Sequence, residues 1–166
     1  MADPLSTIAS VIGVAAAVVQ SAKILFELVD DIKNAPEEIA ALSRDAHAFY
    51  SIVFSLQLSL SEDAIQNVVG QDRTMTQMVE NLRSPLANCQ KVLGQLMVKI
   101  QGGLKRTDDG TGWRMSSINI KWGLFTKGEI KDLMVRLEAT KSTLDNALNS
   151  ICTCVIALPI NASRNH

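Results

Sequence analysis

The segment PLSTIASVIGVAAAVVQSAKILFELVDDIK, residues 4–33, carries the pattern that decides the fold. Its aliphatic side chains recur at alternating steps of three and four residues, at Ile8, Val11, Ala15, Val18, Ala22, Leu25, Val29 and Ile32. That period places one apolar stripe along a helix. Asp3 suits an N-cap and Pro4 suits the first helical position, so we expect a helix from Pro4 to about Lys33.

The same spacing of apolar residues occurs in three further segments, 39–60, 75–100 and 130–158. Proline interrupts the chain before the first of these and again at Pro85, which is expected to end or kink a helix. Thr126 followed by Glu129 is a capping box that would open the last helix. Amphipathic helices bury their stripes against one another, so the sequence predicts an all-α bundle of four to six helices.

The helical period disappears between about residues 102 and 127, where glycines mark turns. An apolar alternation begins at Ile118, but no second strand is visible to pair with it. We therefore expect one long irregular loop over about 102–127, with an extended segment docked on the bundle. The predicted organisation is a single bundle domain over residues 1–158 and a short disordered tail over 159–166.

Composition excludes several classes of protein. The chain has 166 residues, 47% of them hydrophobic and 4% aromatic, and a formal net charge of −1. Disordered chains have low hydrophobicity and high net charge, so this chain is expected to fold. The near-neutral balance also argues against binding to nucleic acid through bulk positive charge.

The number of cysteines and the composition of the N-terminus indicate the cellular compartment of the protein. Cys89, Cys152 and Cys154 are an odd number, which suits buried structural thiols in a reducing compartment better than a disulfide framework or a metal site. The N-terminus lacks the basic region of a secretory signal, and no continuous apolar run reaches the ~18–20 residues of a transmembrane helix. A cytoplasmic protein is the expectation, with plasma-membrane association on activation.

No motif indicates catalysis. His47 stands beside an apolar stripe and suits a surface or boundary position, and no nucleophile motif surrounds the serines. The glycine-containing stretch GGLKR lacks the spacing of a phosphate-binding loop. We therefore expect no enzyme activity, no catalytic, cofactor or metal site, and no small-molecule substrate.

Charge is unevenly distributed. Residues 1–101 carry 7 basic and 11 acidic groups, a balance of −4, whereas residues 102–127 carry 5 basic and 2 acidic groups, a balance of +3. Basic and aromatic residues of that loop are candidates for contact with anionic lipid headgroups: Lys105, Arg106, Trp113, Arg114, Lys121 and Trp122. The alternative is that the tryptophans pack the loop onto the bundle while its charges are solvated.

The first helix has more apolar surface than one stripe requires. From Leu5 to Val19 its only polar side chains are Ser6, Thr7 and Ser10. A helix apolar nearly all round is either buried or destined for lipid or a partner. Burial and contact with lipid are compatible if the helix is buried in the resting protein and released on activation.

Three stretches of the chain resemble a known family: MADPLSTIASVIGVAAAVVQSAK (1–23), EEIAALSRDAHAFYSIVFSL (37–56) and WGLFTKGEIKDLMVRLEATKSTL (122–144). Together they resemble the N-terminal domain of fungal STAND or NOD-like receptors, in the HeLo-like group and of the azaphilone pigment cluster protein N-terminal type. The similarity extends over roughly residues 1–150.

The resemblance implies a helical effector domain of intracellular immunity or heterokaryon-incompatibility signalling. Such a domain would oligomerise and insert its N-terminal helix into the membrane, causing cell death. The residues that would insert are Leu5, Ile8, Val11, Ile12, Val14, Val18 and Val19. Expected partners are further copies or a homotypic domain, and anionic membrane lipid. The alternative is a non-lytic adaptor that recruits STAND receptors through its helix faces.

Overall fold

The computed structural model describes residues 3–106, 109–115 and 127–162. In that part of the chain there are six helices: α1 (Pro4–Asp30), α2 (Glu37–Ser61), α3 (Asp63–Gln71), α4 (Arg73–Glu80), α5 (Arg83–Gly102) and α6 (Lys127–Ala162). Two short strands, β1 (Leu104–Arg106) and β2 (Trp113–Met115), lie between α5 and α6. The predicted all-α helical bundle is confirmed.

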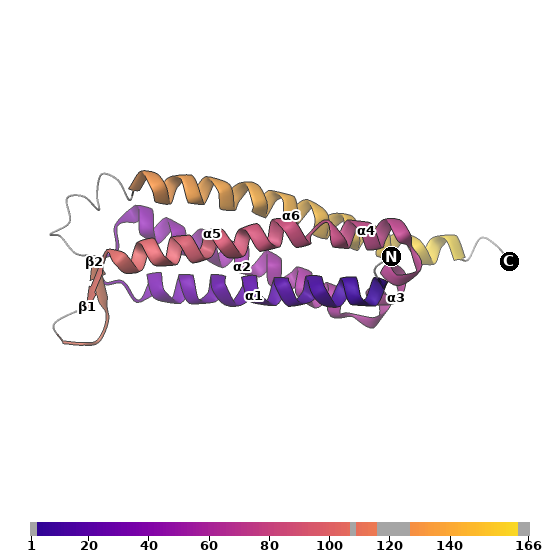
Figure 1. Cartoon of the computed structure of the whole chain (residues 1–166), viewed down its shortest axis with the longest axis horizontal. Helices are drawn as coiled ribbons and strands as arrows, with labels where there is room; N and C mark the ends of the chain where they lie inside the picture. The colour runs from indigo at the N-terminus through magenta and orange to yellow at the C-terminus, as the bar shows by residue number, and fades with distance from the viewer. Residues whose placement is uncertain (1–2, 107–108, 116–126, 163–166) are drawn as a thin grey trace.

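The four long helices lie side by side and alternate in direction (Figure 1). α1 packs on α2 and α5, whereas α6 packs on α5 and α2. The short helices α3 and α4 connect α2 to α5 at the end of the bundle where α1 begins, and the two strands lie at the opposite end (Figure 1). The bundle therefore has an α1 N-terminal end and a hairpin end.

Apolar stripes of the four segments form the core. Every member of the stripe of residues 8–32 is at most 6% exposed, and the largest fully buried side chain is Phe49 of α2. α5 contributes Leu86, Cys89, Leu93, Leu96 and Ile100, and α6 contributes Ile130, Leu133, Leu137, Leu144 and Ile151. Periodicity alone thus identified the buried face of each long helix.

Helix boundaries follow local chemistry. Asp3 caps α1 as predicted, since its Oδ2 accepts from the Ser6 N–H at 3.1 Å. α1 ends at Asp30, three residues short of the prediction, and the chain then turns through Asn34 (φ 55°) before Pro36. Pro85 lies in the first turn of α5, where its missing N–H costs nothing, and the break comes just before Arg83. Thr126 of the predicted capping box lies outside the described residues.

Within the expected irregular loop, the described residues include two short strands, Leu104–Arg106 and Trp113–Met115, which the sequence did not predict. β1 and β2 pair antiparallel, with Leu104 opposite Met115, Lys105 opposite Arg114 and Arg106 opposite Trp113. Each strand has only three residues, too few for an alternation of apolar and polar side chains to stand out in the sequence. The hairpin is held by backbone partners in the turn after α1. The alternation that begins at Ile118 lies outside the described residues.

Residues 159–162, which were expected in a disordered tail, belong to α6. Pro159 removes one backbone donor without ending the helix here. Residues 163–166, the rest of the expected tail, lie outside the described residues.

Candidate membrane-active surface

α1 carries a second apolar stripe beside the buried one. Leu5, Ile12, Val19 and Phe26 recur every seven residues, and we call them the outer stripe. Leu5 is 58% exposed, whereas the other three are partly buried and pack against the edge of the core. The outer stripe therefore gives α1 apolar surface in addition to its fully buried stripe, and Leu5 leaves part of that surface exposed to solvent.

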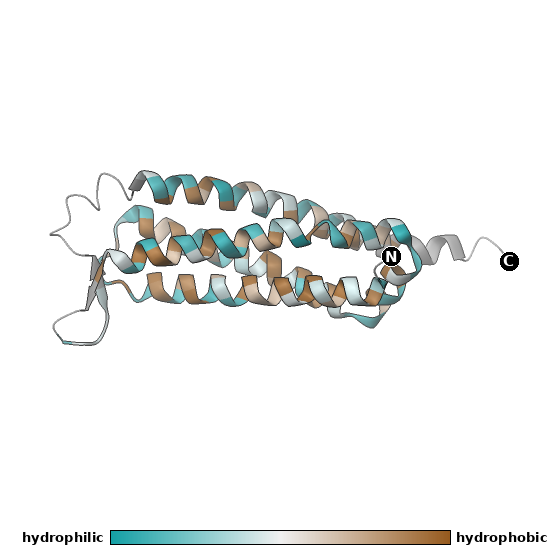
Figure 2. Cartoon of the chain, viewed as in Figure 1, coloured by the Kyte–Doolittle hydropathy of each residue, from teal (hydrophilic) through white to brown (hydrophobic). Residues whose placement is uncertain are grey.

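The exposed face of α1 beyond the outer stripe carries small or uncharged residues up to Ala22. Ala9 and Gly13 face solvent, and α1 has no charged side chain from Leu5 to Ala22. Figure 2 colours most of α1 brown or white, the colours of hydrophobic and intermediate residues. α1 is a helix long and apolar enough to cross a membrane, and 33% of its most apolar 18-residue window is buried. α1 meets these criteria although no continuous apolar run reaches 18 residues, because Ser6, Thr7 and Ser10 interrupt the run without adding charge.

The candidate insertion residues divide into three groups. Ile8, Val11 and Val18 are in the core, with at most 2% of their surface exposed. Ile12, Val14 and Val19 are partly buried against it, and Leu5 is exposed. In this folded state the candidates do not form one outward surface, so only part of the proposed inserting surface is accessible.

Aromatic side chains extend the outer stripe onto α2. Phe26 meets the edge of Tyr50 at a ring-centroid distance of 5.6 Å, and Tyr50 stacks on Phe54, also at 5.6 Å. Phe54 is 38% and Leu58 is 52% exposed. An apolar seam, formed by the outer stripe with Tyr50, Phe54 and Leu58, therefore runs along α1 and α2.

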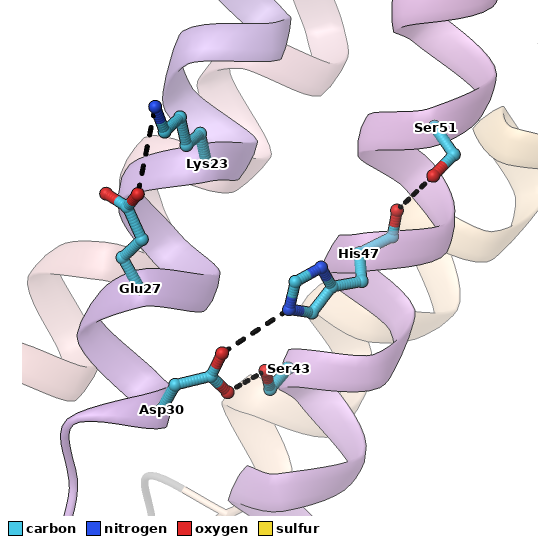
Figure 3. Close-up of polar contacts among 6 residues, drawn as sticks. All are labelled: Lys23, Glu27, Asp30, Ser43, His47 and Ser51. Atoms are coloured by element: carbon cyan, nitrogen blue, oxygen red, sulfur yellow. Dashed lines mark hydrogen bonds and ion pairs between the residues drawn. The ribbon is translucent and has the colours of Figure 1, made fainter.

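A polar cluster that the sequence analysis missed joins the C-terminal end of α1 to α2 (Figure 3). The Ser43 hydroxyl donates to Asp30 Oδ1 at 2.5 Å, and His47 Nε2 lies 3.3 Å from Asp30 Oδ2. The His47 ring also stacks on Phe26, with centroids 3.7 Å apart. The signal was hidden because antiparallel packing brings together residues 13 and 17 positions apart.

The order of these contacts does not suit nucleophilic catalysis. Asp30 lies between Ser43 and His47, whereas activation of a serine requires its hydroxyl to contact the base directly. The carboxylate of Asp30 is also at the negative end of the α1 dipole, where donors from α2 offset an unfavourable interaction. The cluster acts as a polar clamp between two helices.

The hairpin is attached to the turn that follows α1. The Lys33 N–H donates to the Trp113 carbonyl at 2.8 Å, and the Trp113 N–H donates to the Asp31 carbonyl at 3.4 Å. Lys33 Nζ also contacts Asp109 Oδ2 at 3.2 Å and Thr111 Oγ1 at 2.9 Å. These contacts join the hairpin to the C-terminal end of α1.

The candidate headgroup residues are only partly placed. Lys105, Arg106, Trp113 and Arg114 all lie on the two strands, and Trp113 is partly buried against the core. Lys121 and Trp122 lie outside the described residues. The four candidates on the strands do not lie next to Leu5, because the hairpin and the start of α1 are at opposite ends of the bundle (Figure 1).

The cysteines are free thiols in different surroundings. Cys89 is buried between α5 and α6, whereas Cys152 and Cys154 are partly buried. Burial raises the pKa of the Cys89 thiol from 9.0 to about 11, against a smaller lowering by its hydrogen bond with Thr140. Within the described residues, no three His, Cys, Asp or Glu side chains are grouped as a metal site.

The raised pKa of Cys89 predicts a pH-dependent stability. The folded state keeps its proton between pH 9 and about 11, where the unfolded thiol has lost it. The free energy of unfolding should therefore fall as pH rises through that window. Urea unfolding at several pH values checks this, with Cys89→Ala as the control that should fall less steeply; equal slopes would contradict the assignment.

These features define an all-α bundle domain with an apolar seam along α1 and α2. The chain belongs to the family described as pigment biosynthesis cluster protein PigL N-terminal, whose sequence model matches residues 2–158. The resemblance to a pigment cluster N-terminal domain is thereby confirmed. A search of curated proteins and of solved structures finds no match.

Proposed function

We propose that this domain is a membrane-directed effector that oligomerises and inserts α1 into the lipid bilayer. The observation that carries the proposal is the surplus apolar surface of α1: a buried stripe, an outer stripe and no charge between Leu5 and Ala22. Its 27 residues give a length of about 40 Å, which exceeds the ~30 Å hydrocarbon core.

The distribution of polar contacts supports release of the N-terminal part of α1. In the described part of the chain, every side-chain hydrogen bond or ion pair from α1 to another element involves Asp30, at its C-terminal end. The residues before Lys23 meet the other helices through apolar packing, which has no directional requirement and which lipid can replace. The C-terminal end of α1 is thus the natural pivot.

Release nevertheless exposes a core. Val11, Ala15, Val18, Ala22 and Leu25 are all 0% exposed, so a single domain loses much of its packing when α1 leaves. Oligomerisation offsets this cost because several helices then engage one membrane and their individual affinities multiply.

Fungal immunity or incompatibility signalling that ends in cell death is the role proposed for such an effector, and the cytoplasmic face of the plasma membrane is its proposed site of action.

Vesicle leakage and flotation test the proposal. The chain is measured alone and fused at its C-terminus to a tetrameric coiled coil, on vesicles of phosphatidylcholine with 30% phosphatidylserine, a composition chosen for the assay. We expect flotation and dye release from the fused chain, and little from the unfused chain. A fused chain that remains folded by circular dichroism yet neither floats nor releases dye would exclude membrane insertion.

A non-lytic homotypic adaptor for STAND receptors is the second candidate function. It is favoured by the apolar seam, which includes Phe54 and Leu58 on α2 as well as the outer stripe of α1. Insertion of α1 alone gives no role to the α2 side of that seam, whereas docking of a second helical domain would cover both helices.

Leu58→Glu distinguishes the two functions. Leu58 is 52% exposed, so the substitution should cost less than about 1 kcal/mol of stability. An adaptor should lose self-association about tenfold or more in analytical ultracentrifugation, because a charge would be buried in its interface. A membrane effector carrying Leu58→Glu should keep its leakage activity when the coiled coil enforces the tetramer. Loss of leakage in that fusion would show that the apolar seam is needed for membrane activity.

A further inference from the structure

We infer that the β1–β2 hairpin is an anionic-lipid contact that fixes the orientation of inserted α1: the Pro4 end crosses the bilayer while the hairpin stays at the headgroups of the leaflet it entered. This inference rests on the proposed insertion of α1. It adds a direction, a stopping point and a lipid class, which insertion alone does not specify.

The hairpin is attached to the chain just after α1, so it lies at the C-terminal end of α1, the end that does not cross the bilayer in this proposal. Two backbone hydrogen bonds join Trp113 to Asp31 and Lys33, and Ile32 pairs with Trp113 as a parallel bridge. The clamp of Asp30 with Ser43 and His47 lies one residue earlier. When the N-terminal part of α1 swings away, these contacts keep its C-terminal end beside the hairpin.

Length then sets the depth. Leu5 to Ala22 is an uncharged run of 18 residues, or about 27 Å of helix, close to the ~30 Å of hydrocarbon. Lys23 is the first charge after it, and α1 ends at Asp30, about 10 Å further along. With this run in the hydrocarbon, the hairpin comes to the level of the headgroups.

The distribution of basic residues along the chain supports the same direction of insertion, with the Pro4 end crossing the bilayer. Residues 1–22 contain no Lys or Arg, whereas Lys23 and Lys33 follow, and the strands add Lys105, Arg106 and Arg114. Basic residues beside a spanning helix stay on the cytoplasmic side. The acidic residues near this end are Glu27, Asp30, Asp31, Glu37, Glu38 and Asp109. Of these, Glu27 pairs with Lys23, Glu37 with Arg44 and Asp109 with Lys33.

The register of the hairpin adds an independent argument for an anion. Lys105 and Arg114 are directly opposite each other in the ladder. Like charges at opposed positions destabilise an antiparallel pair, and a two-stranded hairpin has little stability of its own. A negatively charged headgroup layer would favour two basic residues at opposed positions, and phosphatidylserine in the cytoplasmic leaflet supplies such a layer.

The charge test uses two double variants that remove the same net charge. Lys105→Gln/Arg114→Gln alters the hairpin, and Lys91→Gln/Arg136→Gln alters exposed residues of α5 and α6. Both are measured in the tetrameric fusion by flotation on phosphatidylcholine vesicles with and without phosphatidylserine. We expect the hairpin variant to lose about 30-fold in binding to the anionic vesicles, roughly fivefold per charge, and the control less than threefold.

The orientation test uses a fluorophore that dithionite quenches only from outside the vesicle. It is attached at Ser6→Cys or Thr111→Cys in a chain carrying Cys89→Ala, Cys152→Ser and Cys154→Ser. For protein added from outside, we expect the probe at position 111 to be quenched and the probe at position 6 to be protected. The opposite result would reverse the assigned direction.

Failure of the inference and failure of the proposed function give different results. If the unaltered fusion does not bind vesicles of either composition, insertion itself is wrong. If it binds and leaks equally well without phosphatidylserine, or if both double variants lose binding equally, insertion stands and the specific role of the hairpin is wrong.

Discussion

Gly13→Lys should reduce vesicle leakage about 100-fold while leaving the folded domain at least as stable. Gly13 is exposed on α1, and a side chain added there meets no heavy atom within 4 Å. Lysine forms helices better than glycine, by roughly 0.5–1 kcal/mol at an exposed position. At the centre of a membrane-spanning helix, however, a lysine costs about 2.5–3.5 kcal/mol, which is the origin of the expected loss.

Two matched variants control this experiment. Gly13→Ala should keep full leakage, because it adds no charge. Gly94→Lys makes the same change at an exposed, open position on α5, which is not expected to insert. Leakage retained by Gly13→Lys, or lost equally by Gly94→Lys, would show that α1 does not enter the bilayer in the proposed way.

Phe49→Ala should lower the free energy of unfolding by about 3–5 kcal/mol. Phe49 is 0% exposed and is the largest fully buried side chain, so the change removes apolar contacts and leaves a cavity. Phe54→Ala on the same helix is the control. Phe54 is 38% exposed and stacks on Tyr50, so its loss should cost only about 1 kcal/mol.

Urea unfolding followed by circular dichroism measures both values. The transition midpoint should fall for Phe49→Ala with little change in its slope, because the same surface is exposed on unfolding. Similar costs for the two variants would contradict the separation between the core of the bundle and the apolar seam on its surface.

The buried face of each long helix was predictable because core packing imposes its period on the residues themselves. Ile8 to Ile32 and Ile39 to Leu60 are buried at the positions that steps of three and four select. The start of α1 was equally accessible, since Asp3 and Pro4 act locally through one N-cap and one fixed backbone angle.

Features made by residues distant in sequence could not be predicted in this way. The clamp of Asp30 with Ser43 and His47 exists because α1 and α2 run antiparallel in one particular register. The hairpin depends on backbone bonds between Trp113 and the turn after α1, which leave no periodic trace in the sequence. The additional apolar surface of α1 was visible in the sequence, but which of its residues are buried and which form the outer stripe depends on how the helices pack in the structure.

The depth of α1 in the bilayer tests the central claim most directly. A fluorophore is placed at Ala9→Cys on α1 or at Gly94→Cys on α5, both exposed positions, in the tetrameric fusion carrying the three replacements of native cysteines. Vesicles then contain a quencher at mid-acyl-chain depth. We predict strong quenching at position 9 and almost none at position 94. Vesicle-bound protein with no quenching at position 9 would contradict the insertion of α1.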